Sequence, residues 1–179
     1  GANVEDVTSG TPLGLVKTAL ATGGPLPLAF DPRTAVDFLF GNMNGCIGEV
    51  SALALLIGGI YLLWRRCISW QTPVFFIGTV LVFATILWRI SPLTNMAPLF
   101  HMLSGGLMLG ALFMATDMVT SPVTKKGMIV FGIGCGLLTI VIRKWGGYPE
   151  GVSFAILLMN AVTPLINRAT RPRVLGHGK

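Results

Sequence analysis

Acidic residues lie at the borders of long apolar runs of this sequence. Glu49 precedes the first run and Asp117 follows the third. An acidic side chain beside membrane-like sequence costs free energy and by default marks an ion or proton route. Each also has a structural alternative, because Glu49 would stabilise a helix N-terminus and Asp117 would cap the turn that follows it. We take Glu49 and Asp117 as candidates for an ion path.

A cluster of hydroxyl side chains lies near the start of the sequence, at Thr8-Ser9-Gly10-Thr11-Pro12. The small residues around each hydroxyl leave it accessible to a modifying enzyme. Pro12 also disfavours a helical conformation at Thr11. Taken alone, such a cluster is typical of an ordinary loop.

The cysteine and histidine residues indicate no metal chemistry. Cys46, Cys67 and Cys135 lie far apart in the sequence and form no C-x-x-C pair. We expect each of them to act as a small hydrophobic side chain. His101 and His177 are the two histidines of the sequence. We expect His101 to be a hydrogen-bonded histidine at a helix-packing interface, and we propose no metal site.

The composition excludes an ordinary soluble enzyme. Charged residues make up 11% of 179 residues, whereas a soluble domain has about 25%. Hydrophobic residues reach 53% and the mean hydropathy is +0.74. The net charge of +6 is scattered, with no continuous basic stripe to follow a phosphate backbone. We therefore expect a lipid bilayer and no nucleic-acid partner.

Uncharged runs predict the membrane spans, because a helix needs about 20 apolar residues to cross a bilayer. Five runs qualify or nearly qualify: 50–64, 67–88, 90–116, 127–142 and 151–167. Where a run is short, Arg65, Arg143 and Arg168 would extend it by placing their guanidinium groups in the headgroup layer. The sequence predicts an all-α integral membrane protein with about five transmembrane helices preceded by an extramembrane loop.

Glycines inside the runs indicate close helix packing. Gly106-x-x-x-Gly110 and Gly132-x-x-x-Gly136 are faces on which two helix backbones can touch. The alternative is that these glycines make room for a flat cofactor.

The distribution of basic residues predicts the orientation. With five spans, eight basic residues fall on one side and five on the other, so the positive-inside rule places the C-terminus in the cytoplasm. We expect a periplasmic loop at 1–47, rich in turn-forming residues, a five-helix membrane domain at 48–168 and a basic cytoplasmic tail at 169–179. An odd number of spans after a loop suggests that the chain before Gly1 is missing, removed or a separate polypeptide, and that these spans are part of a larger helical bundle.

Five segments together resemble one family over almost the whole chain. They are EDVTSGTPLGLVKT (5–18), GCIGEVSALALLIGG (45–59), ATDMVTSPVTKKG (115–127), GGYPEGVSFAILLMNAVTPLI (146–166) and RPRVLGHGK (171–179). In these segments the chain resembles the C-terminal half of the RnfD (RsxD) component of the Rnf (Rsx) ion-translocating electron-transport complex. The NqrB component of the Na+-pumping NADH:quinone reductase is similar, but the TPL after the hydroxyl cluster and the RPRV tail favour Rnf.

The resemblance implies a covalently bound FMN, attached through its phosphate to a threonine by a flavin transferase. Aligning the family pattern on the following Pro-Leu places the acceptor at Thr11. Thr8 and Ser9 are the alternative acceptors, and Thr8, Ser9 and Gly10 would contact the cofactor from the same loop. Glu5 stands at the acidic position and Gly10 where alanine is usual. A second flavin, riboflavin or another, would be bound mainly by a missing N-terminal half.

Asp117 and Thr120 are the residues of this sequence that we expect to contribute to that second flavin site. The resemblance further implies electron transfer between ferredoxin and NAD coupled to Na+ or H+ translocation. It also implies the A, B, C, E and G components of the Rnf complex as partners in a bacterial inner membrane. Two alternatives stay open: part of an NqrB-like reductase component, or a flavin-free fragment of a secondary transporter with broken helices.

Overall fold

The computed structural model describes Gly14, Phe40 and residues 51–90, 97–104, 106–146 and 150–171. Within these ranges the chain forms helices and no strand. In order they are α4 (Ala52–Trp64), α5 (Gln71–Ile90), α6 (Pro98–Leu103), α7 (Leu107–Leu109), the π-helix η1 (Gly110–Met114), α8 (Lys125–Trp145) and α9 (Val152–Ala169). The predicted all-α class is confirmed.

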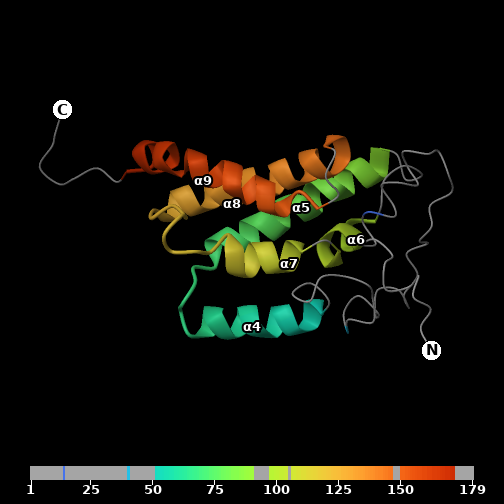
Figure 1. Cartoon of the computed structure of the whole chain (residues 1–179), viewed down its shortest axis with the longest axis horizontal. Coiled ribbons are helices and arrows are strands. Elements are labelled where there is room, and N and C mark those ends of the chain that lie inside the picture. The colour runs from blue at the N-terminus through green and yellow to red at the C-terminus, as the bar shows by residue number, and fades with distance from the viewer. Residues whose placement is uncertain are drawn as a thin grey trace, which may run out of the picture.

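Three long helices, α5, α8 and α9, lie side by side and form the main layer of the bundle (Figure 1). Each is long and apolar enough to cross a membrane, at 20, 21 and 18 residues. They correspond to the predicted runs 67–88, 127–142 and 151–167. Helix α4, at 13 residues, is a shorter apolar helix. The chain is therefore an all-α membrane protein, while the predicted total of five spans and the domain boundaries stay predictions.

Glycines of α8 bring its backbone against that of α5. A Cβ atom added to Gly132 would lie 2.8 Å from the carbonyl oxygen of Thr72, and one added to Gly136 would lie 2.9 Å from that of Phe76. The predicted Gly132-x-x-x-Gly136 packing face is confirmed. The space beside these glycines is filled by α5, so they leave no room for a flat cofactor.

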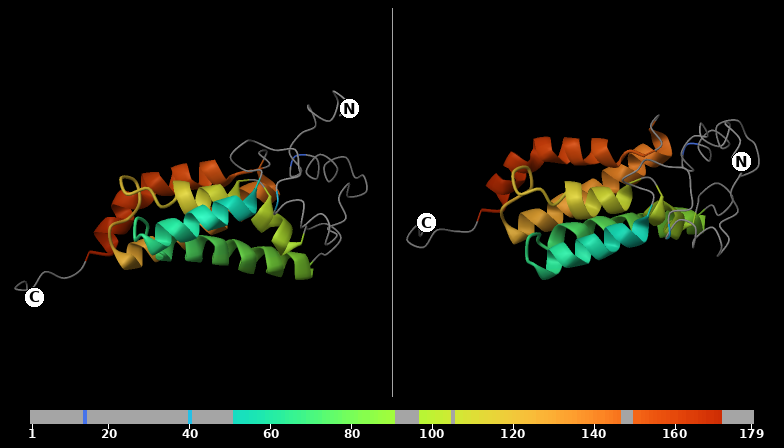
Figure 2. Two further views of the ribbon diagram at one scale, coloured as in Figure 1. Left: turned by 90° about the horizontal axis from the view of Figure 1, so that it is seen from below. Right: turned by 60° about the horizontal axis from the view of Figure 1, so that its bottom comes forward.

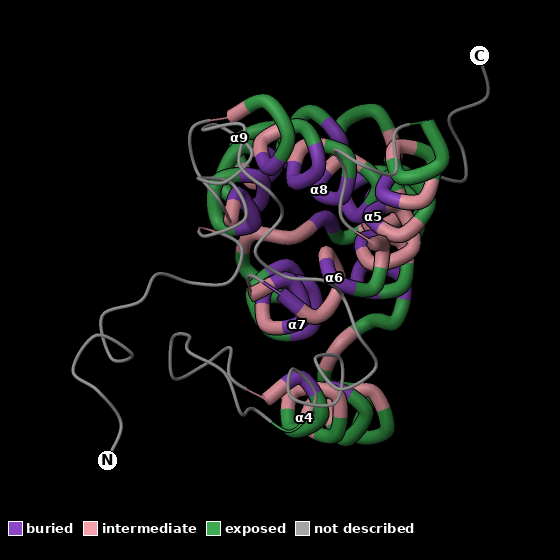
Figure 3. Tube along the Cα trace, turned by 90° about the vertical axis from the view of Figure 1, so that its right-hand side faces the viewer, coloured by how far each residue is buried: buried purple, intermediate pink, exposed green. Residues whose placement is uncertain are grey.

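The buried core lies where α5, α8, α9 and η1 meet (Figure 3). Phe76, Val80, Phe131 and Cys135 are fully buried there. Cys135 is a free thiol and acts as a small hydrophobe, as expected.

Helix α4 lies apart from the three long helices (Figures 1 and 3), and it lies in front of them when the bundle is seen from below (Figure 2). Gly58 and Gly59 face Phe113 and Leu112 of η1, and a Cβ atom added to Gly59 would lie 2.8 Å from Leu112. On the other side of α4, large apolar side chains such as Trp64 are exposed. That side suits contact with lipid or with further membrane protein.

The third predicted run, 90–116, is not one continuous helix. Within its described part, α6 ends at Leu103, Ser104 adopts an extended conformation, and helix resumes at Leu107. Gly106, which precedes Leu107, has φ of +62°, a left-handed conformation that glycine adopts readily. The pieces nevertheless follow one another along the bundle (Figure 1), so together they form a discontinuous helix.

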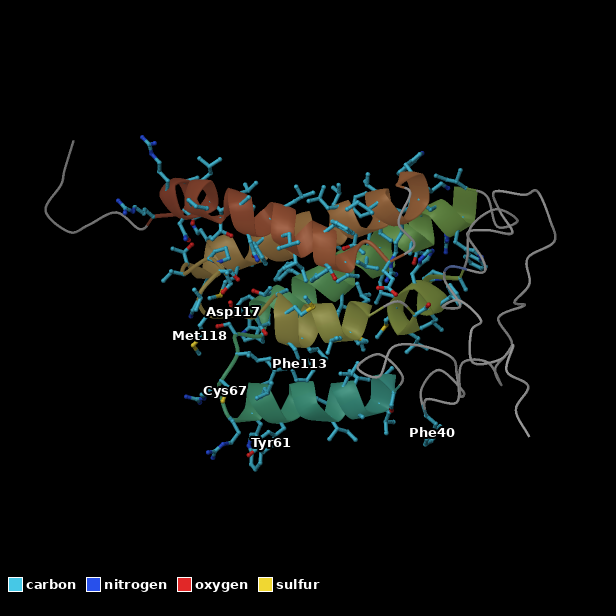
Figure 4. The ribbon with its side chains drawn as sticks, in the orientation of Figure 1. Phe40, Tyr61, Cys67, Phe113, Asp117 and Met118 are labelled. Atoms are coloured by element: carbon cyan, nitrogen blue, oxygen red, sulfur yellow. The ribbon has the colours of Figure 1, made fainter. Side chains whose placement is uncertain are left out.

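Among the described residues, Lys125, Lys126 and Arg171 lie at one end of the bundle, whereas Arg89 and Arg143 lie near the ends of α5 and α8 toward the other. The turn after α4, the loop between η1 and α8, and the end of α9 share one end, which carries Cys67, Asp117 and Met118 (Figure 4). Phe40 lies at the opposite end (Figure 4). Assignment of the first end to the cytoplasm stays a prediction.

Candidate functional site

A buried arginine donates hydrogen bonds to the backbone at the break in the discontinuous helix. Arg143, near the end of α8, donates from Nη1 to the carbonyl oxygen of His101 at 2.6 Å and from Nη2 to that of Ser104 at 3.0 Å. Its Nε donates to the carbonyl oxygen of Glu150 at 2.9 Å. Only 6% of Arg143 is exposed. One guanidinium thus joins α6, α8 and the segment that leads into α9.

These hydrogen bonds satisfy backbone carbonyl groups that the break in the helix would otherwise leave without a partner. The last carbonyl groups of any helix lack partners within the helix, and an unsatisfied carbonyl inside a membrane costs several kcal/mol. Hydrogen bonds from a charged donor contribute about 1.5–3 kcal/mol each and offset the cost of burying the guanidinium. The expectation that Arg143 extends into the headgroup layer is therefore wrong, because the carbonyl groups at the helix break bind it inside the protein.

His101 lies in α6 beside this break. Its ring packs edge-on against Phe100, with 6.2 Å between ring centroids. Its Nδ1 atom is buried and has no hydrogen-bond partner among the described residues. The packing role expected for His101 is confirmed, but Nδ1 lacks the expected hydrogen bond within the described part of the chain.

Asp117 and Thr120 lie close together in the loop after η1, at the end of the bundle (Figure 4). The hydroxyl of Thr120 donates to Oδ2 of Asp117 at 3.2 Å, and the backbone N–H of Ser121 donates to the carbonyl oxygen of Asp117 at 3.1 Å. Asp117 is exposed. The carboxylate thus accepts a hydrogen bond from a side chain, and the turn is closed by the backbone of Asp117. The role of Asp117 in an ion path stays a prediction.

A small pocket lies next to Asp117, between the turn that follows α4 and the loop that precedes α8. Its volume is about 230 Å³. The residues that line it are Cys67, Ile68, Ser69, Thr72, Thr116, Met118, Ser121, Pro122, Val123 and Met128. Ligand pockets usually measure about 300–1,000 Å³, so this pocket does not enclose a whole flavin by itself. No local sequence pattern indicates this pocket, because the two segments that line it are about fifty residues apart in the chain.

The remaining predicted site residues, Thr8, Ser9, Gly10, Thr11 and Glu49, lie outside the described residues. Within the described ranges, no group of three or more His, Cys, Asp or Glu side chains is placed to hold a metal ion.

The structure thus defines a class: an all-α membrane protein in which a buried arginine holds a discontinuous helix. A sequence profile of the NQR2, RnfD, RnfE family matches residues 2–176. The chain therefore belongs to the NQR2, RnfD, RnfE family.

Three relatives illustrate the similarity, and each is the D component of an oxidoreductase complex. That of the Na(+)-translocating ferredoxin:NAD(+) oxidoreductase complex of Acetobacterium woodii is 49% identical over 172 residues, 96% of this chain and 50% of the relative. That of the proton-translocating ferredoxin:NAD(+) oxidoreductase complex of Clostridium ljungdahlii is 47% identical over 98% of this chain and 53% of the relative. The D component of the ion-translocating oxidoreductase complex of Stutzerimonas stutzeri is 45% identical over 98% of this chain and 50% of the relative. The chain spans about half the length of these relatives.

Proposed function

We propose that this chain is the part of an RnfD-type membrane protein that carries a covalently bound FMN. The protein would take part in electron transfer between ferredoxin and NAD, coupled to the movement of Na+ or H+. Identity of 45–49% to the D components of three such complexes, over almost the whole chain, is the observation that carries this proposal. The partners would be the A, B, C, E and G components of the Rnf complex in a bacterial inner membrane.

The attachment point in this proposal is Thr11. Its hydroxyl lies among small residues and ahead of a proline, and alignment of the family pattern on Pro12 and Leu13 places the acceptor there. A flavin supplies one- and two-electron redox chemistry when it is bound. On attachment, the Oγ1–H bond of Thr11 is replaced by a bond from Oγ1 to phosphorus. The flavin transferase would therefore use a flavin nucleotide whose phosphate is joined to a second phosphate group; that phosphoanhydride bond would break as the new bond forms, and the second phosphate group would leave with the hydroxyl proton.

Flavin fluorescence of the denatured protein tests this attachment. The full-length protein from cells that contain the flavin transferase should give a fluorescent band in a denaturing gel, and Thr11→Ala should abolish it. Thr8→Ala and Ser9→Ala are matched controls that should keep the band. A fluorescent band from Thr11→Ala would move the attachment to another residue.

For the second flavin, we propose that Asp117 and Thr120 contribute polar contacts from the loop after η1. The adjacent pocket of about 230 Å³ is too small for a complete flavin. Protein outside this chain would therefore provide most of that site.

For ion movement, we propose Glu49 and Asp117 as groups that bind the cation. Moving one charge against 100 mV costs about 2.3 kcal/mol, so coupling requires groups whose cation affinity changes with the redox state. The names of two relatives state different ions, Na+ at 49% identity and protons at 47%. Overall identity therefore does not select the ion for this chain.

A flavin-free transporter is the second candidate function. The observation in its favour is the discontinuous helix formed by α6, α7 and η1, because transporters bind solutes at broken helices. This candidate predicts a colourless protein. The purified, denatured protein should instead retain the yellow absorption of a flavin if the first proposal holds.

A further inference from the structure

We propose that a basic pocket at the junction of α8 and α9 binds the phosphate headgroup of an anionic phospholipid. The pocket measures about 1,010 Å³ and opens at the end of the bundle where α8 begins and α9 ends. It is lined by Val123, Thr124, Lys125, Lys126, Asn167, Thr170 and Arg171. Three of these side chains are cationic and none is acidic.

Hydrogen bonds connect the start of α8 to the end of α9 at this pocket. The hydroxyl groups of Thr124 and Thr170 lie 2.6 Å apart and share a hydrogen bond. The backbone N–H of Val123 donates to Oδ1 of Asn167 at 3.1 Å. Gly127 permits this approach, because a Cβ atom there would lie 3.1 Å from Oγ1 of Thr170, the residue that caps the end of α9. The cations at both helix ends are therefore held around one cavity.

The positive charges around the pocket are not balanced by an acidic residue in the first turn of α8. Lys125 and Lys126 occupy the first turn of this 21-residue helix, and that turn has no acidic residue. The N-terminus of a helix already carries positive partial charge, so two lysines there add to it. Arg171 contributes a third charge from the end of α9. An external anion would relieve this concentration of positive charge.

Exposed apolar side chains in the loop that leads to the pocket favour a lipid over a free anion or an acidic protein. Met118, Val119 and Val123, in the loop that leads to Lys125, are 78%, 88% and 81% exposed. They lie at the end of helices of membrane-spanning length. Apolar groups beside cations suit the boundary between acyl chains and phosphates, and basic pockets at this depth are typical sites for anionic headgroups.

Lipid binding to the detergent-solubilised, full-length protein tests the proposal. Phosphatidylglycerol, phosphatidylcholine and inorganic phosphate would each be titrated, with retained lipid measured by native mass spectrometry. The variant Lys125→Gln/Lys126→Gln removes two charges from the pocket. Its matched control is Arg65→Gln/Arg66→Gln, an adjacent basic pair at the same end of the bundle but outside the pocket.

The proposal expects phosphatidylglycerol to bind more tightly than phosphatidylcholine. The lysine variant should lose affinity for phosphatidylglycerol on the order of 10-fold or more, and the arginine control should keep it. Equal affinity in both variants, or equal binding of both lipids, would overturn the proposal. Tight binding of inorganic phosphate alone would assign the pocket to a free anion.

A second measurement needs no variant and so does not depend on correct folding of one. Photoreactive phosphatidylglycerol added to the wild-type protein should crosslink to the peptides that contain residues 123–126 and 167–171. Crosslinks confined to other helices would contradict the assignment. Flavin attachment at Thr11 has a separate readout, so failure of this proposal and failure of the proposed function are distinguishable.

Discussion

The guanidinium of Arg143 donates a hydrogen bond of 2.6 Å to the backbone carbonyl of His101, a residue 42 positions away in the chain. This contact joins the end of α8 to the last turn of α6. It lets the third apolar segment stop and restart inside the bundle without leaving its final carbonyl groups unsatisfied. The discontinuous helix and the buried arginine are therefore one structural feature.

Removing this arginine should destabilise the bundle. Arg143→Met leaves three carbonyl groups without that donor, at about 1–3 kcal/mol each, so we expect a loss of roughly 3 kcal/mol or more in the free energy of unfolding. Arg143→Lys should be intermediate, because an ammonium cannot reproduce the planar arrangement of donors. Thermal or denaturant unfolding in detergent measures the effect. Arg89→Met, at an exposed position, is the control, and an equal effect of both substitutions would contradict the role of Arg143.

The contact between α5 and α8 should be sensitive to a single methyl group. Gly136→Ala places a Cβ atom 2.9 Å from the carbonyl oxygen of Phe76, so we expect a loss of about 1–3 kcal/mol from overpacking. Gly78→Ala is a matched control within α5, because nothing lies within 4 Å of a Cβ atom there. That control should be neutral or slightly stabilising, since alanine favours helix by up to about 1 kcal/mol. Indistinguishable unfolding curves would show that the helices do not pack this closely.

The conformation at Gly106 should resist substitution. Its φ of +62° is left-handed, which costs a residue with a Cβ atom about 1–2 kcal/mol. We expect Gly106→Ala to lower stability by that amount and Gly106→Asn to lower it less, because asparagine tolerates this region better. If unfolding experiments rank the alanine variant above the asparagine variant, the helix break has a different backbone geometry.

Substitution of the two acidic residues should separate ion transport from stability. Asp117→Asn and Glu49→Gln should reduce ion movement by the assembled complex in vesicles while flavin fluorescence is unchanged. Asp117 is exposed, so its substitution should change the free energy of unfolding by no more than about 0.5 kcal/mol. Glu150→Gln, at an acidic residue outside the proposed ion path and flavin sites, is the matched control. Unchanged ion movement in both acidic variants would remove these residues from the path.

The sequence is sufficient to predict the helical membrane class and the three long helices. Apolar runs and flanking charges report directly on membrane insertion, and α5, α8 and α9 are close to the runs that predict them. Gly132 and Gly136 pack as predicted, because small residues four positions apart in one helix share a face. The prediction of such a face at Gly106 and Gly110 is wrong, because Gly106 is left-handed and lies before the helix begins.

The sequence could not reveal how the helix break is satisfied. Arg143 near the end of an apolar run has the pattern of a side chain that reaches the headgroup layer, and no local signal distinguishes this from burial against another helix. The distinction depends on His101, Ser104 and Glu150, which the fold brings to Arg143 from other segments. The basic pocket is similar, since Arg171 and Lys125 meet only through the packing of α8 on α9.

Mass spectrometry of the peptide that ends at Lys17 tests the central claim most directly. The protein would be isolated from cells that contain the flavin transferase and digested with trypsin. The account predicts a peptide that carries the added mass of FMN, with fragmentation placing it on Thr11. The same peptide at its unmodified mass, from cells that attach FMN to another flavoprotein, would contradict the account.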